Sequence, residues 1–108
     1  MLSYEMVREM ALQLERNSPP EYFEKMIKFY ENIARKYTNQ CLEHVEGSSE
    51  IQFSVVARID KNGNVIGTWE SSNTKQSKCY KQLLLESSFP IPWNFPFYTV
   101  IDMTGKTL

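Results

Sequence analysis

The residue pair that comes nearest to a catalytic motif is Cys41 and His44, which lie three positions apart. A cysteine thiolate beside an imidazolium is an activated nucleophile, so this spacing could serve covalent catalysis. The histidine is also explained as a residue at the C-terminal end of a helix, where an imidazole meets the carbonyl end of the helix dipole. We favour the second interpretation.

Other chemical motifs are missing from the chain. The four glycines are scattered and form neither a Gly-x-Gly-x-x-Gly sequence nor a phosphate-binding loop. Most carboxylates fall on the polar faces of expected helices beside Lys or Arg, whereas Asp60 precedes an Asn-Gly turn and Asp102 is an exposed strand residue. We therefore expect that the protein is not an enzyme, and we predict no catalytic residue, metal ligand or cofactor.

The two cysteines, Cys41 and Cys79, are too few for a disulfide framework and too widely spaced for a zinc or redox motif. They are either two small, partly buried thiols or one disulfide that joins the end of a helix to a later helix. The second alternative requires an oxidising compartment.

The composition of the 108 residues argues against several kinds of partner. With 12 basic and 13 acidic residues the formal charge is −1, whereas nucleic acids and anionic membranes are bound by concentrated positive charge. The strand aromatics Trp69 and Phe97 could stack bases, but such platforms come with a positive groove, so we expect no nucleic-acid partner. No stretch approaches the roughly 20 apolar residues needed to span a bilayer, so we expect no direct membrane insertion by this segment.

Two amphipathic helices are predicted before the strands. Residues 2–16 carry an apolar stripe opposite a charged side, and an Asn-Ser-Pro-Pro sequence ends that helix. Ser18 and Glu21 have the spacing of a capping box, with Pro19 at the first helical position. Residues 19–39 then carry a wide apolar face rich in aromatic side chains, which we interpret as core.

The second half of the chain predicts strands around a third helix. Residues 51–59 alternate apolar and polar positions, which is typical of a strand buried on one face. An Asn-Gly pair after Asp60 predicts a tight hairpin with a return strand at 64–70. A Ser-Ser-Asn-Thr stretch then caps a helix that ends before a Phe-Pro-Ile-Pro segment, and residues 97–103 read as a third strand.

This order of elements predicts the α+β class. It places N-terminal helices before a β-β-α-β unit at residues 51–104, with a three-stranded antiparallel sheet and helices packed on one face. We expect residues 1–108 to form a single domain, since this length is common for one.

The last predicted strand is a candidate docking edge, because it is apolar and β-prone and carries little of the charge or proline that protects sheet edges. An exposed edge can serve as a docking site for an extended peptide. The alternatives are that this strand lies at the centre of the sheet or is covered by the N-terminal helix.

The stretch from Phe53 to Ile66, with its Asp-Lys-Asn-Gly turn, resembles the first hairpin of the C-terminal domains of TonB and TolA. The likeness continues through a Ser-Ser loop, a helix that bears Cys and Leu, and the Phe-Pro-Ile-Pro segment, and it covers about residues 20–104. A helix before the first strand is more like TolA than TonB. In TolA-like domains a cysteine of the first strand can pair with one in the later helix, and Cys79 is placed like the helix partner.

The resemblance implies a periplasmic domain of a cell-envelope transport system that binds a protein partner by β-augmentation, with the added strand beside the last strand of its sheet. In this chain, the resemblance places the partner-binding sheet edge at Phe97, Tyr98, Thr99, Val100, Ile101, Asp102 and Met103.

A second hypothesis is a small cytoplasmic accessory protein, chaperone-like or immunity-like, that binds its partner through aromatic helix faces. We expect a periplasmic location if an export or anchor segment was removed ahead of residue 1, and a cytoplasmic location otherwise. In both cases the partner is a protein, and the residues specify neither its identity nor an oligomeric state.

Overall fold

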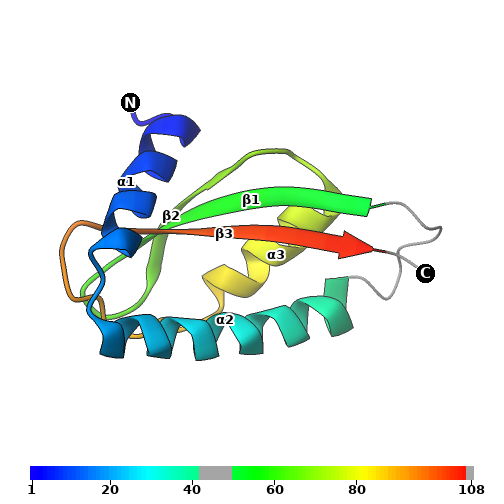
Figure 1. The fold of residues 1–108 in the computed structure, drawn as a ribbon. Helices are drawn as coiled ribbons and strands as arrows, with labels where there is room; N and C mark the ends of the chain where they lie inside the picture. The colour runs from blue at the N-terminus through cyan, green and yellow to red at the C-terminus, as the bar shows by residue number, and fades with distance from the viewer. Residues whose placement is uncertain (42–49, 107–108) are drawn as a thin grey trace.

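A computed structural model describes residues 1–41 and 50–106 and confirms the α+β class (Figure 1). The order of helices and strands is the one expected from the sequence, and their bounds shift by a few residues. His44 and the Gly-Ser-Ser break after it lie outside the described residues. The elements are α1 (Tyr4–Arg16), α2 (Pro20–Cys41), β1 (Glu50–Ile59), β2 (Val65–Glu70), α3 (Lys75–Leu85) and β3 (Phe97–Lys106).

The helix starts follow from local capping. The Ser3 hydroxyl accepts a hydrogen bond from the Met6 N–H at 3.2 Å and so satisfies one of the free amides at the start of α1. At α3, Thr74 and Ser77 form a capping box in which each side chain accepts from the other residue's backbone N–H. The predicted start of α2 was one residue early. The helix begins at Pro20, whose fixed backbone angle suits a first helical position.

The three strands form an antiparallel sheet in the order β2-β1-β3. The predicted hairpin between β1 and β2 is present, and Asp60 holds its turn by accepting hydrogen bonds from the backbone N–H groups of Asn62 and Asn64. Gly63 adopts a φ of +87°, which a side chain would disfavour. A Cβ at this position would also clash with the Phe89 carbonyl oxygen, so the segment after α3 packs tightly on the turn.

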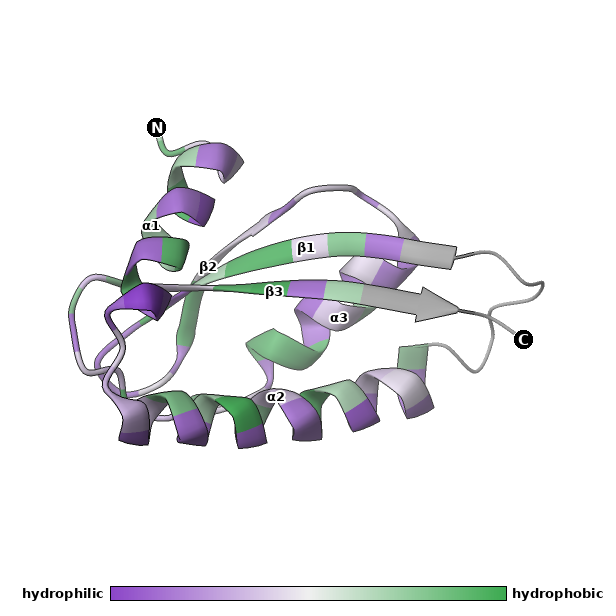
Figure 2. Cartoon of the chain, in the orientation of Figure 1, coloured by the Kyte–Doolittle hydropathy of each residue, from purple (hydrophilic) through white to green (hydrophobic). Residues whose placement is uncertain are grey.

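The larger core lies between one face of the sheet and helices α2 and α3. Alternate residues of β1 point into it because successive side chains of a strand point to opposite faces. Figure 2 shows that α2 is hydrophobic along the side turned toward the sheet and hydrophilic on the opposite side. The aromatic residues of α2 lie mostly inside this core, in edge-to-face contacts such as that between Tyr37 and Tyr80.

The helix α1 packs on the opposite face of the sheet, which differs from the expectation that all helices share one face. Val7 and Ala11 form a second buried cluster with Val56 of β1 and Tyr98 of β3. The indole N–H of Trp69 donates to the Leu2 carbonyl oxygen at 3.2 Å and fixes the start of the helix. The reason for the difference is that the second face of the sheet also carries large apolar side chains, which need cover.

Candidate functional site

β3 is an edge strand, because β1 lies between it and β2. The direction of the β3 backbone groups can be traced through β1. The Ser71 N–H donates to the Ser54 carbonyl oxygen at 2.9 Å, so the backbone of Ser54 faces β2. Successive residues of a strand direct their backbone groups to opposite sides, so those of Val55 and Ala57 face β3.

Every second residue of β3 therefore directs its backbone groups away from the sheet. The register pairs Ala57 with Thr99, and this pair exchanges ladder hydrogen bonds, as does every second pair along the two strands. Within residues 1–41 and 50–106, no backbone–backbone hydrogen bond joins the intervening residues to a segment on their outer side. Among the predicted edge residues 97–103, those with outward N–H and C=O groups are Tyr98, Val100 and Asp102.

The structure brings the seven predicted edge residues together on β3, but most of their side chains are buried. Val100 and Met103 are half-buried, and Asp102 is exposed. The remaining four are at most 8% exposed, namely Phe97, Tyr98, Thr99 and Ile101. A partner at this edge would therefore bind mainly to the main chain.

The exposed carboxylate of Asp102 is held by α1. Arg8 donates to it at 2.9 Å, and the Ser54 hydroxyl also donates to it. The hydrogen bond from Arg8 is the main reason why the pKa of Asp102 lies below its ordinary value. This ion pair joins α1 to β3 on the face opposite α2.

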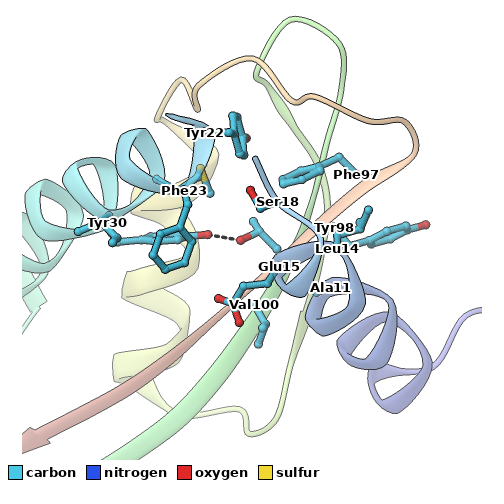
Figure 3. A pocket seen from close by; sticks show the side chains of 13 residues that line it. Ala11, Leu14, Glu15, Ser18, Tyr22, Phe23, Tyr30, Phe97, Tyr98 and Val100 are labelled. Atoms are coloured by element: carbon cyan, nitrogen blue, oxygen red, sulfur yellow. Dashed lines mark hydrogen bonds between the residues drawn. The ribbon is translucent and has the colours of Figure 1, made fainter. Parts of the chain in front are cut away.

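A pocket of about 140 Å³ lies at the outer edge of β3, between α1 and α2 (Figure 3). Residues 17–19 join the two helices, which lie on opposite faces of the sheet, so this link passes around the β3 edge at the Phe97 end. The residues that line the pocket are Ala11, Leu14, Glu15, Ser18, Tyr22, Phe23, Met26, Ile27, Tyr30, Phe97, Tyr98, Thr99 and Val100.

Two polar side chains of the pocket wall are paired with each other. The hydroxyls of Tyr30 and Thr99 are hydrogen-bonded, as the dashed line in Figure 3 shows. Burial raises the pKa of Tyr30 well above its ordinary value, so its hydroxyl stays protonated at neutral pH. One hydrogen bond joins the two hydroxyls, so neither oxygen lacks a partner when an apolar group lies against this wall.

The mouth of the pocket combines apolar exposure with one negative charge. Phe23 and Ile27 on α2 are 45% and 42% exposed, which is high for side chains of this size. Glu15 on α1 is the one charged residue among those that line the pocket, and it forms no salt bridge with the described residues. The one charged side chain that lines the pocket is therefore an acid without a salt-bridge partner among the described residues.

Cys41 and Cys79 form a disulfide that ties the end of α2 to α3, with their Cα atoms 5.8 Å apart. The bonded sulfur of Cys41 is not a thiolate, so the Cys41–His44 pair lacks its nucleophile while the bond is intact. The described part of the chain contains no group of three or more His, Cys, Asp or Glu side chains placed to hold a metal ion. None of its helices is long and apolar enough to cross a membrane.

The two helical walls of the pocket were not predicted from the sequence. The whole apolar face of residues 19–39 was expected in the core, whereas Phe23 and Ile27 lie at its margin and remain exposed. The width of that apolar face was a signal, because one core does not use such a broad stripe fully. Nothing in the sequence placed Glu15 beside β3, since this proximity depends on which face α1 covers.

Comparisons with models of protein families, with curated proteins and with solved structures find no match to this chain.

Proposed function

We propose that this chain is a protein-interaction domain that binds a partner protein through the outer edge of β3. The observation that carries the proposal is the row of outward backbone groups at Tyr98, Val100 and Asp102, which have no backbone partner among the described residues. An extended peptide pairs with such a row by hydrogen bonds that the edge already presents. The edge therefore supplies affinity without any catalytic group.

The likeness to TonB and TolA supports a more specific form of the proposal, in which the domain works in the periplasm as part of a cell-envelope transport system. The Cys41–Cys79 disulfide favours this location over the cytoplasm, because cytosolic thiols are kept reduced. The redox state of the two cysteines in native material tests the location. Free thiols there would contradict it.

The second candidate is a cytoplasmic accessory protein that binds through the aromatic face of α2. The observation in its favour is the exposure of Phe23 and Ile27. Against it, the other aromatic residues of α2 lie wholly or partly in the core. Reduced cysteines, together with binding that depends on Phe23 and not on the backbone of β3, would favour this candidate.

The proposed function is tested with a proline at one of the outward positions. Val100→Pro removes an outward N–H without removing a ladder hydrogen bond, which edge strands tolerate. Val100→Ala is the control for the loss of the branched side chain, because it removes the two methyl groups and keeps the N–H. Thr99 is unsuitable, because its N–H belongs to the ladder with β1.

Wild type, V100A and V100P serve as parallel baits in an extract of the cells that make the protein, with quantitative mass spectrometry of what each retains. We expect at least one protein to be retained by wild type and V100A and lost with V100P, while circular dichroism shows all three baits folded. If folded V100P retains the same proteins as wild type, the β3 edge is not the binding site.

A further inference from the structure

We call the space at the outer edge of β3 between α1 and α2 the groove, and the pocket lies in it beside residues 97–100. One wall is α1, with Ala11 and Leu14, and the other is α2, with Phe23 and Ile27. Residues 17–19 join the two helices and close the groove at the Phe97 end. Its floor is the backbone edge that presents alternating donors and acceptors. A partner segment in extended conformation satisfies these groups, because adjacent strands lie about 4.8 Å apart and pair through the main chain.

The size of the pocket in this groove limits what enters it. Its volume of about 140 Å³ lies far below the roughly 300–1,000 Å³ of pockets that hold cofactors or drug-sized ligands. An apolar cavity of about 150 Å³ accommodates a molecule of benzene. The pocket therefore matches a single aromatic ring, and its lining of Tyr22, Phe23, Met26 and Leu14 suits one.

The negative charge of Glu15 at the pocket favours a basic residue beside the aromatic ring of the partner. Glu15 has no cationic partner among the described residues, and it is close enough to Tyr30 for its charge to raise the pKa of that hydroxyl slightly further. Of the two cations on α1, Arg8 is engaged by Asp102, and Arg16 forms no salt bridge with Glu15. A basic residue in the partner segment would complete the missing pair with Glu15.

We propose that the groove selects an extended partner segment that inserts an aromatic side chain into the pocket between α1 and α2 and carries an adjacent lysine or arginine opposite Glu15. This inference rests on the proposed function and adds the sequence class that the edge recognises. The main chain gives affinity at the edge, and the pocket with Glu15 gives specificity.

The probe is a random peptide library displayed on phage and selected against the whole oxidised chain, with folded V100P as the counter-selection. We expect the peptides that bind wild type but not V100P to share a Phe, Tyr or Trp with a neighbouring Lys or Arg. In synthetic copies, replacing the aromatic residue by Ala should weaken binding by at least about tenfold, as at other buried aromatic anchors.

Two pairs of variants test the pocket from the side of the protein. Phe23→Ala should weaken these peptides about fivefold or more, whereas Phe95→Ala, at a 52%-exposed residue outside the pocket, should leave binding unchanged. Glu15→Gln should weaken peptides with Lys or Arg about two- to fivefold, and this loss should vanish in about 1 M salt, where the screening length is about 3 Å. Glu24→Gln, at an exposed position on α2 outside the pocket, is the charge control.

The possible failures are distinguishable. If V100P-sensitive peptides show no aromatic or basic preference, or F23A and E15Q bind them like wild type, the inference about the pocket is wrong and the edge remains the binding site. If no peptide is sensitive to V100P, the proposed function fails with it. If sedimentation shows a dimer of wild type that V100P abolishes, a second copy occupies the groove, and the assignment to a partner segment is overturned.

Discussion

Removal of the Cys41–Cys79 disulfide should lower the free energy of unfolding by about 4 kcal/mol. The bond closes a loop over a sequence separation of 38 residues. Restricting the unfolded chain by a loop of this length is worth about 13 cal/mol/K of entropy, which is about 4 kcal/mol at 25 °C. This is a large share of the 5–15 kcal/mol that is typical for a whole domain.

The measurement is urea unfolding followed by circular dichroism, for wild type, Cys41→Ala, Cys79→Ala and the double variant. With a slope of about 2 kcal/mol per molar urea, the midpoint should fall by about 2 M. Each single variant breaks the same cross-link, so each should lose nearly as much as the double variant, and the effects should not add. Wild type unfolded in the presence of a reductant should give the same midpoint.

Two results would refute the reasoning. A loss below about 1 kcal/mol in the double variant would mean that the cross-link does not restrict the unfolded chain as its separation requires. Single losses that sum to the double loss would mean that the stability comes from the packing of two separate side chains. Neither result would depend on the partner of the protein.

Further predictions concern the sheet and its turn. Gly63→Ala should cost at least about 2 kcal/mol in urea unfolding, because the turn needs a positive φ and the new Cβ would meet the Phe89 carbonyl oxygen; a loss under about 0.5 kcal/mol would contradict this packing. Thr99→Pro should destabilise by about 2–4 kcal/mol by leaving the buried carbonyl of Ala57 unpaired, whereas V100P should cost about 1 kcal/mol or less; equal losses would contradict the assignment of the inward and outward residues. The lowered pKa of Asp102 means that its contribution is present above the unfolded value near 4 and is lost as the pH falls through the folded value. Asp102→Asn should therefore cost up to about 1 kcal/mol at pH 7 and show less loss of stability than wild type between about pH 4 and 2, and an identical acid unfolding profile would contradict the role of the carboxylate.

The elements of this fold could be predicted because each has a local signal. The alternation of 51–59, the glycine turn at residue 63 and the proline-bounded helix that begins at Pro20 all depend on neighbours in sequence. The order of these elements also restricted the sheet, since a hairpin needs a third strand to be stable. The class of fold therefore followed from residues that interact over short distances.

The position of α1 and the pocket could not be predicted in the same way. An amphipathic stripe shows that a helix buries one side, but not which surface covers it. The relevant signal was spread over three strands, because Val56, Trp69 and Tyr98 make the second face of the sheet apolar only when the strand register is known. The sequence did predict residues 97–103 as a candidate docking edge, and the strand register then separated the outward backbone groups of this strand from the inward ones.

Amide hydrogen exchange measured residue by residue by NMR, with and without a peptide selected on the wild-type chain, tests the docking edge most directly. In the free protein, the amides of Thr99 and Ile101 should exchange slowly because they pair with β1, and those of Tyr98, Val100 and Asp102 should exchange faster. With the peptide bound, the three outward amides should become protected while the two inward ones change little. Protection confined to other segments, with the outward amides of β3 unchanged, would contradict the proposal that this edge binds the partner.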